Sequence, residues 1–219
     1  MAAAIEVLKN RQDIGVLYVH TTDYPMHMWA PEAPESKAHL ARMDELIGEA
    51  MKAAPDAAFL ATADHGMNAK SLCWDLEQVC AGKGTAIRKA VSTGRDRYMK
   101  HHRGCSGAAY LHLKSPQDAA RVREIVSNVK GVERILTREE AAREFHLMSS
   151  RIGDLMVLGD TDTVFGELDA EKESFPGLRS HGSLHEIEVP LFVYHAKGAP
   201  SADFYNHNLD LARWLYPAA

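Results

Sequence analysis

Acidic and imidazole side chains follow apolar segments at two places in the chain. The segment "IGVLYVHTTDYPMH" ends with Asp23 and His27, and "AAFLATADHGMNAK" carries Asp64 and His65 directly after an apolar run. In open α/β sheets, ligands bind beyond the carboxyl ends of the strands, where loops hold polar groups over a rigid base. A single Asp–His pair is more often a capping carboxylate beside an exposed imidazole, but two such pairs at strand ends favour a binding site.

The donor atoms of these pairs favour a zinc-like or manganese-like cation. Carboxylate oxygen combined with imidazole nitrogen suits such ions, whereas calcium prefers an all-oxygen shell. The Asp-x-x-x-His spacing places Asp23 and His27 on one face if the segment turns helically, unless Pro25 prevents that turn. A third histidine, His181, lies in the glycine-flanked loop "GLRSHGSLHE", where His185 is either a competing ligand or a surface residue.

Apolar segments alternate with helical patterns along the chain, which favours an α/β architecture with a largely parallel sheet. Ser36 to Ala53 is predicted as an amphipathic helix, because its apolar residues recur on one face. The other expected core elements are three strands and a closing helix: Ile14 to Thr21, Ala58 to Ala63, Val189 to Lys197, and the helix Ala202 to Leu215.

The middle of the chain has a different pattern, which predicts an inserted smaller domain. Gly107 to Phe145 has the pattern strand, helix, strand, helix, with Pro116 in the first helical turn and Gly131 just beyond that helix. Gly153 to Asp160 adds another strand. We therefore expect an α+β cap over residues 71–178, inserted between two segments, 1–70 and 179–219, of a metal-binding core with helices on both faces of its sheet.

Composition and charge exclude several classes of protein. The 219 residues are 46% hydrophobic and 25% charged, which is enough to bury a substantial core. The net charge of -5 gives no support for nucleic-acid binding. No apolar run approaches the ~20 residues that span a bilayer, and the start lacks a secretory signal. The three cysteines form neither a metal-type pair nor an even disulfide set, which favours free thiols in the cytoplasm.

Four segments, in this order, resemble the alkaline phosphatase superfamily: "TTDYPMH", "TADHGMNAK", "GDLMVLGD" and "RSHGSLHE". They are most similar to phosphonoacetate hydrolase and its nucleotide pyrophosphatase/phosphodiesterase relatives, and "ADHGMNAK" is the most specific of them. The resemblance spans nearly the whole chain. It implies an alkaline-phosphatase-like fold and a metal-dependent hydrolase of a small phosphonate or phosphate ester. Relatives are often homodimers, which makes a second copy of the chain an expected partner.

The resemblance also implies ligands for two zinc ions. One ion would be bound by Asp23, His27 and His181, and the other by Asp64 and His65 with an earlier Asp and a nucleophilic Thr. Paired cations would neutralise phosphoryl oxygens, activate the attacking oxygen and stabilise the leaving group. The implied reaction cleaves the carbon–phosphorus bond of phosphonoacetate to give acetate and phosphate. A phosphodiesterase or nucleotide pyrophosphatase, and a non-catalytic metal-binding relative, are the alternatives.

The family's nucleophilic Thr and earlier Asp precede the strand that carries Asp23. Residues 1–13 contain neither Thr nor Ser, so we expect the first metal position to be complete and the second to be partial. The expected explanations are a C-terminal portion of a longer enzyme, a reading frame that starts late, or a reduced relative.

Further residues are candidates for contact with the substrate. Relatives use basic residues to hold the substrate's carboxylate, which implies such a role for Lys100, His102 or Arg103 in the cluster "GRDRYMKHHRG"; a solvated loop is the alternative. Asn68 and Lys70 follow the second Asp–His pair and either border the pocket or supply polarity at a helix start.

Overall fold

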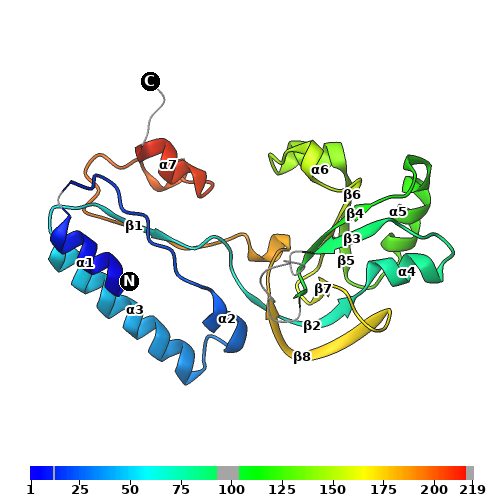
Figure 1. Cartoon of the computed structure of the whole chain (residues 1–219), viewed down its shortest axis with the longest axis horizontal. Helices are drawn as coiled ribbons and strands as arrows, with labels where there is room; N and C mark the ends of the chain where they lie inside the picture. Colours follow the sequence, from blue (N-terminus) through cyan, green and yellow to red (C-terminus); the bar gives the residue numbers. More distant parts are fainter. Residues whose placement is uncertain (12, 93–103, 216–219) are drawn as a thin grey trace. The chain divides into compact units, whose positions relative to one another are not determined.

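A computed structural model describes residues 1–11, 13–92 and 104–215, and Figure 1 labels its elements. The chain divides into two compact units. Unit 1 comprises Met1–Asp64 and Val189–Ala219, and unit 2 comprises His65–Glu188. The predicted cap, residues 71–178, falls inside unit 2. Within the described ranges, no helix is both long and apolar enough to cross a bilayer.

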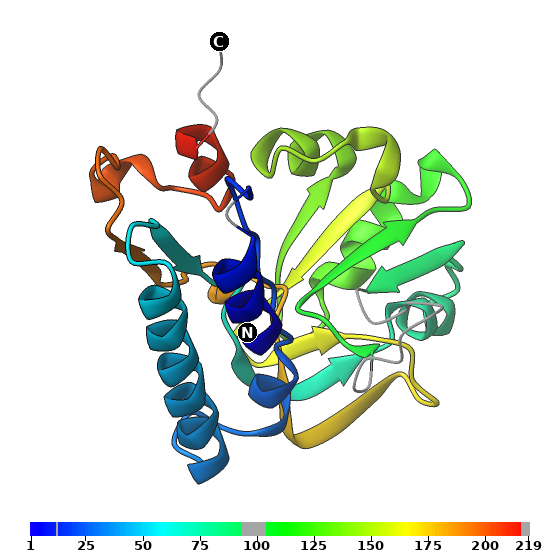
Figure 2. The same ribbon diagram turned by 60° about the vertical axis from the view of Figure 1, so that its left-hand side comes forward.

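Unit 1 is built from helices and one short ladder. Helix α3 confirms the predicted amphipathic helix, and it begins at a proline, whose fixed φ and missing N–H suit a first helical turn. Helices α1 and α3 lie side by side (Figures 1 and 2). Strands β1 and β9 confirm two predicted strands and pair antiparallel. The elements are α1 (Ala2–Asn10), α2 (Tyr24–Met28), α3 (Pro34–Ala53), β1 (Phe59–Thr62), β9 (Leu191–Tyr194), η5 (Ala202–Phe204) and α7 (Leu209–Leu215).

The predicted strand from Ile14 to Thr21 is wrong. Residues 14–21 carry no strand assignment and join no ladder among the described residues. A strand forms only where a neighbour receives its backbone N–H and C=O groups, and in unit 1 β1 pairs with β9 instead. Because the segment is apolar, it was expected to be buried. In the structure it is not, since Tyr18 is 83% exposed.

The predicted closing helix is also shorter than expected. A 3-10 turn, η5, is followed by an irregular stretch before α7 begins at Leu209. The Asp210 carboxylate accepts hydrogen bonds from the backbone N–H groups of Asn206 (2.9 Å) and His207 (2.8 Å). Because these side-chain bonds satisfy the amides in place of helical carbonyls, the helix begins only after them.

Unit 2 contains two sheets and confirms the predicted strand–helix–strand–helix pattern. In the four-stranded sheet the order is β3-β4-β6-β5, with antiparallel ladders. In the three-stranded sheet β2 pairs parallel with β7 and antiparallel with β8. The mixture of helices and strands confirms the α/β class, and among the described strands only β2 and β7 pair parallel. The strands are β2 (Asn68–Trp74), β3 (Lys89–Ser92), β4 (Ala108–His112), β5 (Val132–Thr137), β6 (Leu155–Gly159), β7 (Thr163–Phe165) and β8 (Lys172–Ser180); the helices are α4 (Leu76–Gly82), η2 (Pro116–Asp118), α5 (Ala119–Ser127), α6 (Arg138–Glu144), η3 (Ser149–Arg151) and η4 (Leu184–Glu186).

The four-stranded sheet is covered by helices on both faces. Successive strand residues point to opposite faces, so Ile135 and Val157 join the apolar cluster formed with α4 and α5, while Leu136 and Leu158 join the cluster formed with α6. Val157 and Leu158 are 0% and 1% exposed. This double burial gives unit 2 a rigid base for the loops that leave its strands.

Exposed apolar side chains on unit 1 lead to a first prediction. Tyr18 and Phe192 are 83% and 66% exposed. We expect the chain to bind the apolar dye ANS, and the Tyr18→Ser/Phe192→Ser variant to bind it less, because the changes remove exposed apolar area. Fluorescence titration measures this, with Lys37→Ser at an exposed polar position as the control. Equal fluorescence from the double variant and the control would contradict it.

Candidate metal centre

Helix α2 places the first Asp–His pair on one face. Asp23 is the N-cap residue and Pro25 lies within the first turn, where its missing N–H costs no helical bond. His27 follows one turn later, and its Nε2 lies 3.0 Å from Oδ2 of Asp23. The helical turn that the Asp-x-x-x-His spacing requires is therefore present, with Pro25 accommodated at its start.

His65 lies in the turn that leads into β2. Its Nδ1 is 2.9 Å from the carbonyl oxygen of Gly66. Because a carbonyl oxygen only accepts, this contact is a hydrogen bond when Nδ1 carries the proton, and Nε2 then keeps its lone pair for a metal ion. The N–H of Gly66 in turn donates to the carbonyl oxygen of Glu186 at 2.7 Å. The turn is thus tied to the segment that follows His181.

His181 directly follows β8 and is held through its backbone. Its carbonyl oxygen accepts hydrogen bonds from the N–H of Gly107 (2.8 Å) and from Oγ of Ser106 (3.3 Å). Gly182 has a φ of +108°, and a Cβ there would collide with Oγ of Ser106. Glycine therefore permits both the backbone conformation and the close approach. The neighbouring Ser180 donates through Oγ to the Cys105 carbonyl oxygen at 2.7 Å.

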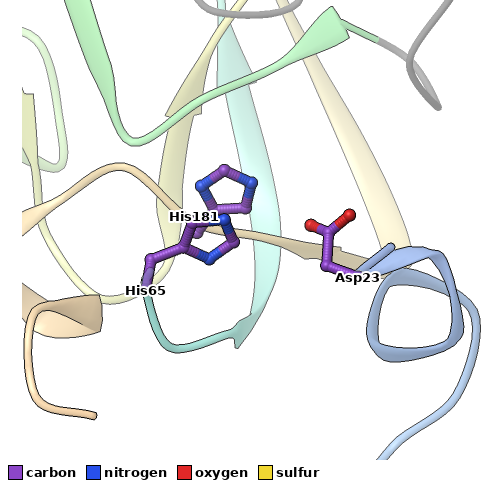
Figure 3. Close-up of side chains that lie close together, drawn as sticks. All are labelled: Asp23, His65 and His181. Atoms are coloured by element: carbon purple, nitrogen blue, oxygen red, sulfur yellow. The ribbon is translucent and has the colours of Figure 1, made fainter. Parts of the chain in front are cut away.

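The imidazoles of His65 and His181 face each other (Figure 3). Their ring centroids are 3.5 Å apart and their planes differ by 12°, and a ligand nitrogen of each lies within 4.8 Å of the other. Two nitrogens on one tetrahedral zinc lie roughly 3.3 Å apart, because each Zn–N bond is about 2.0–2.1 Å. A bound ion lies in the plane of the imidazole that holds it, however, so these nearly parallel, stacked rings suit ligands of two neighbouring ions and not of one. Asp23, also labelled in Figure 3, comes from unit 1.

A buried carboxylate lies behind the two histidine turns. Glu186 accepts hydrogen bonds through Oε1 from Lys70 Nζ (2.8 Å) and Asn68 Nδ2 (2.7 Å). Its Oε2 accepts from the N–H (2.9 Å) and Oγ (2.7 Å) of Ser183. Burial opposes ionisation of Glu186, but the donors from Lys70, Ser183 and Asn68 outweigh it, so the pKa of this carboxyl lies below its usual value. The charged form is therefore the stable one at neutral pH.

The lowered pKa of Glu186 gives a second prediction. The unfolded chain takes up a proton on this carboxyl at a higher pH than the folded chain. The stability that it contributes is therefore present above the usual pKa of 4.5 and is lost as the pH falls through the lower folded value. Urea titrations should show a steeper loss of unfolding free energy below that pH for the parent than for Glu186→Gln. If the unfolding free energies of the parent and of Glu186→Gln fell equally with pH, the prediction would be contradicted.

The remaining predicted site residues lie at different places in the structure. Asp64 is exposed beside His65. His185 Nε2 lies 2.8 Å from a carboxylate oxygen of Glu133 on β5. Asn68 and Lys70 contact Glu186, as described above. Lys100, His102 and Arg103 lie outside the described residues.

Sequence reasoning assigned no role to Glu186. The available signal was Ser183-x-x-Glu186, a capping-box pattern, and the structure forms that box at η4. Its contacts with Asn68 and Lys70 on β2 join segments far apart in the chain, and no local pattern indicated them.

The chain is similar to known phosphohydrolases. Residues 1–184 match the family model described as type I phosphodiesterase / nucleotide pyrophosphatase. Phosphonoacetate hydrolase from Sinorhizobium meliloti 1021, solved in complex with phosphonoacetate, matches with a TM-score of 0.80 and 28% sequence identity. The match covers 92% of this chain and 51% of that protein. The same enzyme in complex with phosphonoformate gives the same values.

More distant structures share the fold. Murine and human ectonucleotide pyrophosphatase / phosphodiesterase 5 match with TM-scores of 0.61 and 0.60 at 16% and 17% identity. These matches cover 88% of this chain and 50% of those proteins. The chain thus spans about half the length of the solved structures that it resembles.

Proposed function

Because this chain belongs to the type I phosphodiesterase / nucleotide pyrophosphatase family, we propose that it provides the metal-binding side chains of a hydrolase that acts on phosphoryl substrates. The observation that carries the proposal is the face-to-face pair of His65 and His181, at 3.5 Å, on two turns held by backbone hydrogen bonds. Imidazole nitrogen is a preferred ligand of zinc. Zinc is therefore the proposed metal.

The proposed ligands divide between two metal positions. Asp23, His27 and His181 bind the first ion, and Asp64 and His65 contribute to the second. The contact between Asp23 and His27 supports the first set, because it brings one oxygen and one nitrogen donor together on α2. The Nδ1 contact of His65 with a carbonyl oxygen supports the second, because it leaves Nε2 as the donor. When bound, the ions would supply positive charge to phosphoryl oxygens and lower the pKa of an attacking oxygen.

Phosphonoacetate is the proposed substrate. Water supplies a hydroxyl group to phosphorus and a proton to the carbon that leaves, which gives phosphate and acetate. The support is the 28% identity and TM-score of 0.80 with a phosphonoacetate hydrolase over 92% of this chain. The likeness to the ectonucleotide enzymes rests on the fold at 16% identity, so it does not favour a nucleotide substrate.

Zinc binding and substrate turnover test the proposal separately. Equilibrium dialysis followed by elemental analysis should find at least about one zinc per chain, removable by EDTA. Phosphate release from phosphonoacetate should then exceed nitrophenol release from a nitrophenyl phosphodiester. Zinc bound without either reaction would favour the alternatives of a non-catalytic metal-binding relative or of a fragment, and no bound zinc would reject the proposed centre.

A further inference from the structure

The buried pair of Lys70 and Glu186 joins the two turns that carry His65 and His181. Lys70 lies on β2, five residues after His65, and Glu186 lies five residues after His181. Their side chains are 0% and 1% exposed, and Nζ of Lys70 is 2.8 Å from Oε1 of Glu186. Nζ also lies 3.5 Å from the carbonyl oxygen of Asp160. A charged contact thus crosses from one turn to the other, inside unit 2.

Backbone contacts on either side of this pair act on the same two turns. Gly66, next to His65, donates to the backbone carbonyl of Glu186 at 2.7 Å. At the start of β2, Asn68 lies opposite Ser180, the residue before His181. Any change in the separation of Lys70 and Glu186 is therefore transmitted to the residues that flank both imidazoles.

Stability alone does not account for the pair. Removing two charges from water is costly, and well-packed apolar residues in place of a buried ion pair are often as stable or more stable. What an apolar pair lacks is a fixed distance and direction, because its contacts are non-directional. Glu186 also has four hydrogen-bond donors arranged around its two oxygens. This geometry determines where the His181 loop lies against β2.

We propose that the Lys70–Glu186 pair is a positioning device that sets the separation of His65 and His181. This inference rests on the proposed function insofar as the two imidazoles bind metal. It gives Lys70 a role behind the metal ligands in place of contact with the substrate.

Zinc affinity tests the inference in the holo-protein. Lys70→Met keeps the length and apolar stem of the side chain and leaves Glu186 with its donors from Asn68 and Ser183. We expect the Kd for zinc, measured by competition with a chromogenic chelator, to rise about 10–100-fold, as it does when groups that orient metal ligands are removed. The Lys70→Met/Glu186→Leu variant leaves no unpaired charge, so it should fold and still bind zinc more weakly.

A matched control separates positioning from general loss of stability. Val122→Ala removes core contacts on α5, where the side chain is 0% exposed and belongs to a cluster formed away from the two turns. Its Kd should stay within about twofold of the parent, because distant sites act independently. If the Kd of both Lys70 variants also stays within that range, or if Val122→Ala weakens zinc binding as much as they do, the inference is overturned.

A metal-free measurement separates failure of this inference from failure of the proposed function. In the apo-protein, NMR should show a cross-relaxation peak between imidazole protons of His65 and His181 in the parent and in Val122→Ala. Lys70→Met should weaken that peak strongly. If the parent binds no zinc, the proposed function fails. The NMR comparison of the parent with Lys70→Met still tests whether the Lys70–Glu186 pair positions the two imidazoles. An unchanged peak in Lys70→Met would reject that positioning role.

Discussion

Replacing His181 by alanine is expected to lower the zinc affinity of the chain by more than about 100-fold. Removal of groups that merely orient a metal ligand costs about 10–100-fold, and loss of the ligand itself should cost more. The backbone around His181 is fixed by the hydrogen bonds that its carbonyl oxygen accepts from Gly107 and Ser106. The change should therefore remove the donor nitrogen without displacing the loop. Asp23→Ala should have a similar effect.

His185→Ala is the matched control for this prediction. His185 lies in the same loop, but its Nε2 contacts Glu133 at 2.8 Å, so its removal should leave zinc affinity within about threefold of the parent, as expected for a residue outside the ligand set. Competition titrations measure both variants, with circular dichroism to confirm folding. A loss confined to His185→Ala would transfer the ligand role from His181 to His185.

Gly107→Ala is expected to cost about 1–3 kcal/mol of unfolding free energy, the usual range for overpacking. An added Cβ would lie 2.6 Å from the backbone nitrogen of Ser183 and 2.8 Å from its Cβ. Both atoms belong to a segment fixed by Glu186, since Ser183 donates to that carboxylate through N–H and Oγ. The strain should therefore displace the His181 loop as well as destabilise unit 2.

Urea denaturation measures this cost, and Gly48→Ala provides the control. Gly48 lies inside α3, and an added Cβ there meets nothing within 4 Å. Alanine should stabilise that helix by up to about 1 kcal/mol, because glycine is a poor helix former. Zinc titration of Gly107→Ala should show weaker binding in parallel. A Gly107→Ala protein as stable as the parent would show that the contact with Ser183 is loose.

The parts of the fold that were predictable are those with local signals. Pro116 lies in the first turn of η2 and Gly131 has a φ of +85° beyond α5, so the elements of unit 2 were visible in the sequence. Residues 14–21 have an equally strong apolar pattern, but pairing with another strand decides their structure. That pairing depends on distant segments, which a single sequence does not reveal.

The same distinction separates the site residues. The spacing of Asp23 and His27 predicts their contact because one helical turn joins them. The stacking of His65 on His181 depends instead on the pairing of β2 with β8, across more than a hundred residues. Lys70 has the composition of a surface residue, yet its partner Glu186 makes it one of the most buried side chains of unit 2. Sequence reasoning therefore found the ligand candidates and missed the ion pair behind them.

The most direct test of the metal centre is anomalous diffraction at the zinc edge from crystals of the zinc-loaded chain. We expect a peak about 2.0–2.2 Å from an imidazole nitrogen of His181 and from a carboxylate oxygen of Asp23. A strong zinc peak elsewhere, with neither side chain within bonding distance, would contradict the proposed centre.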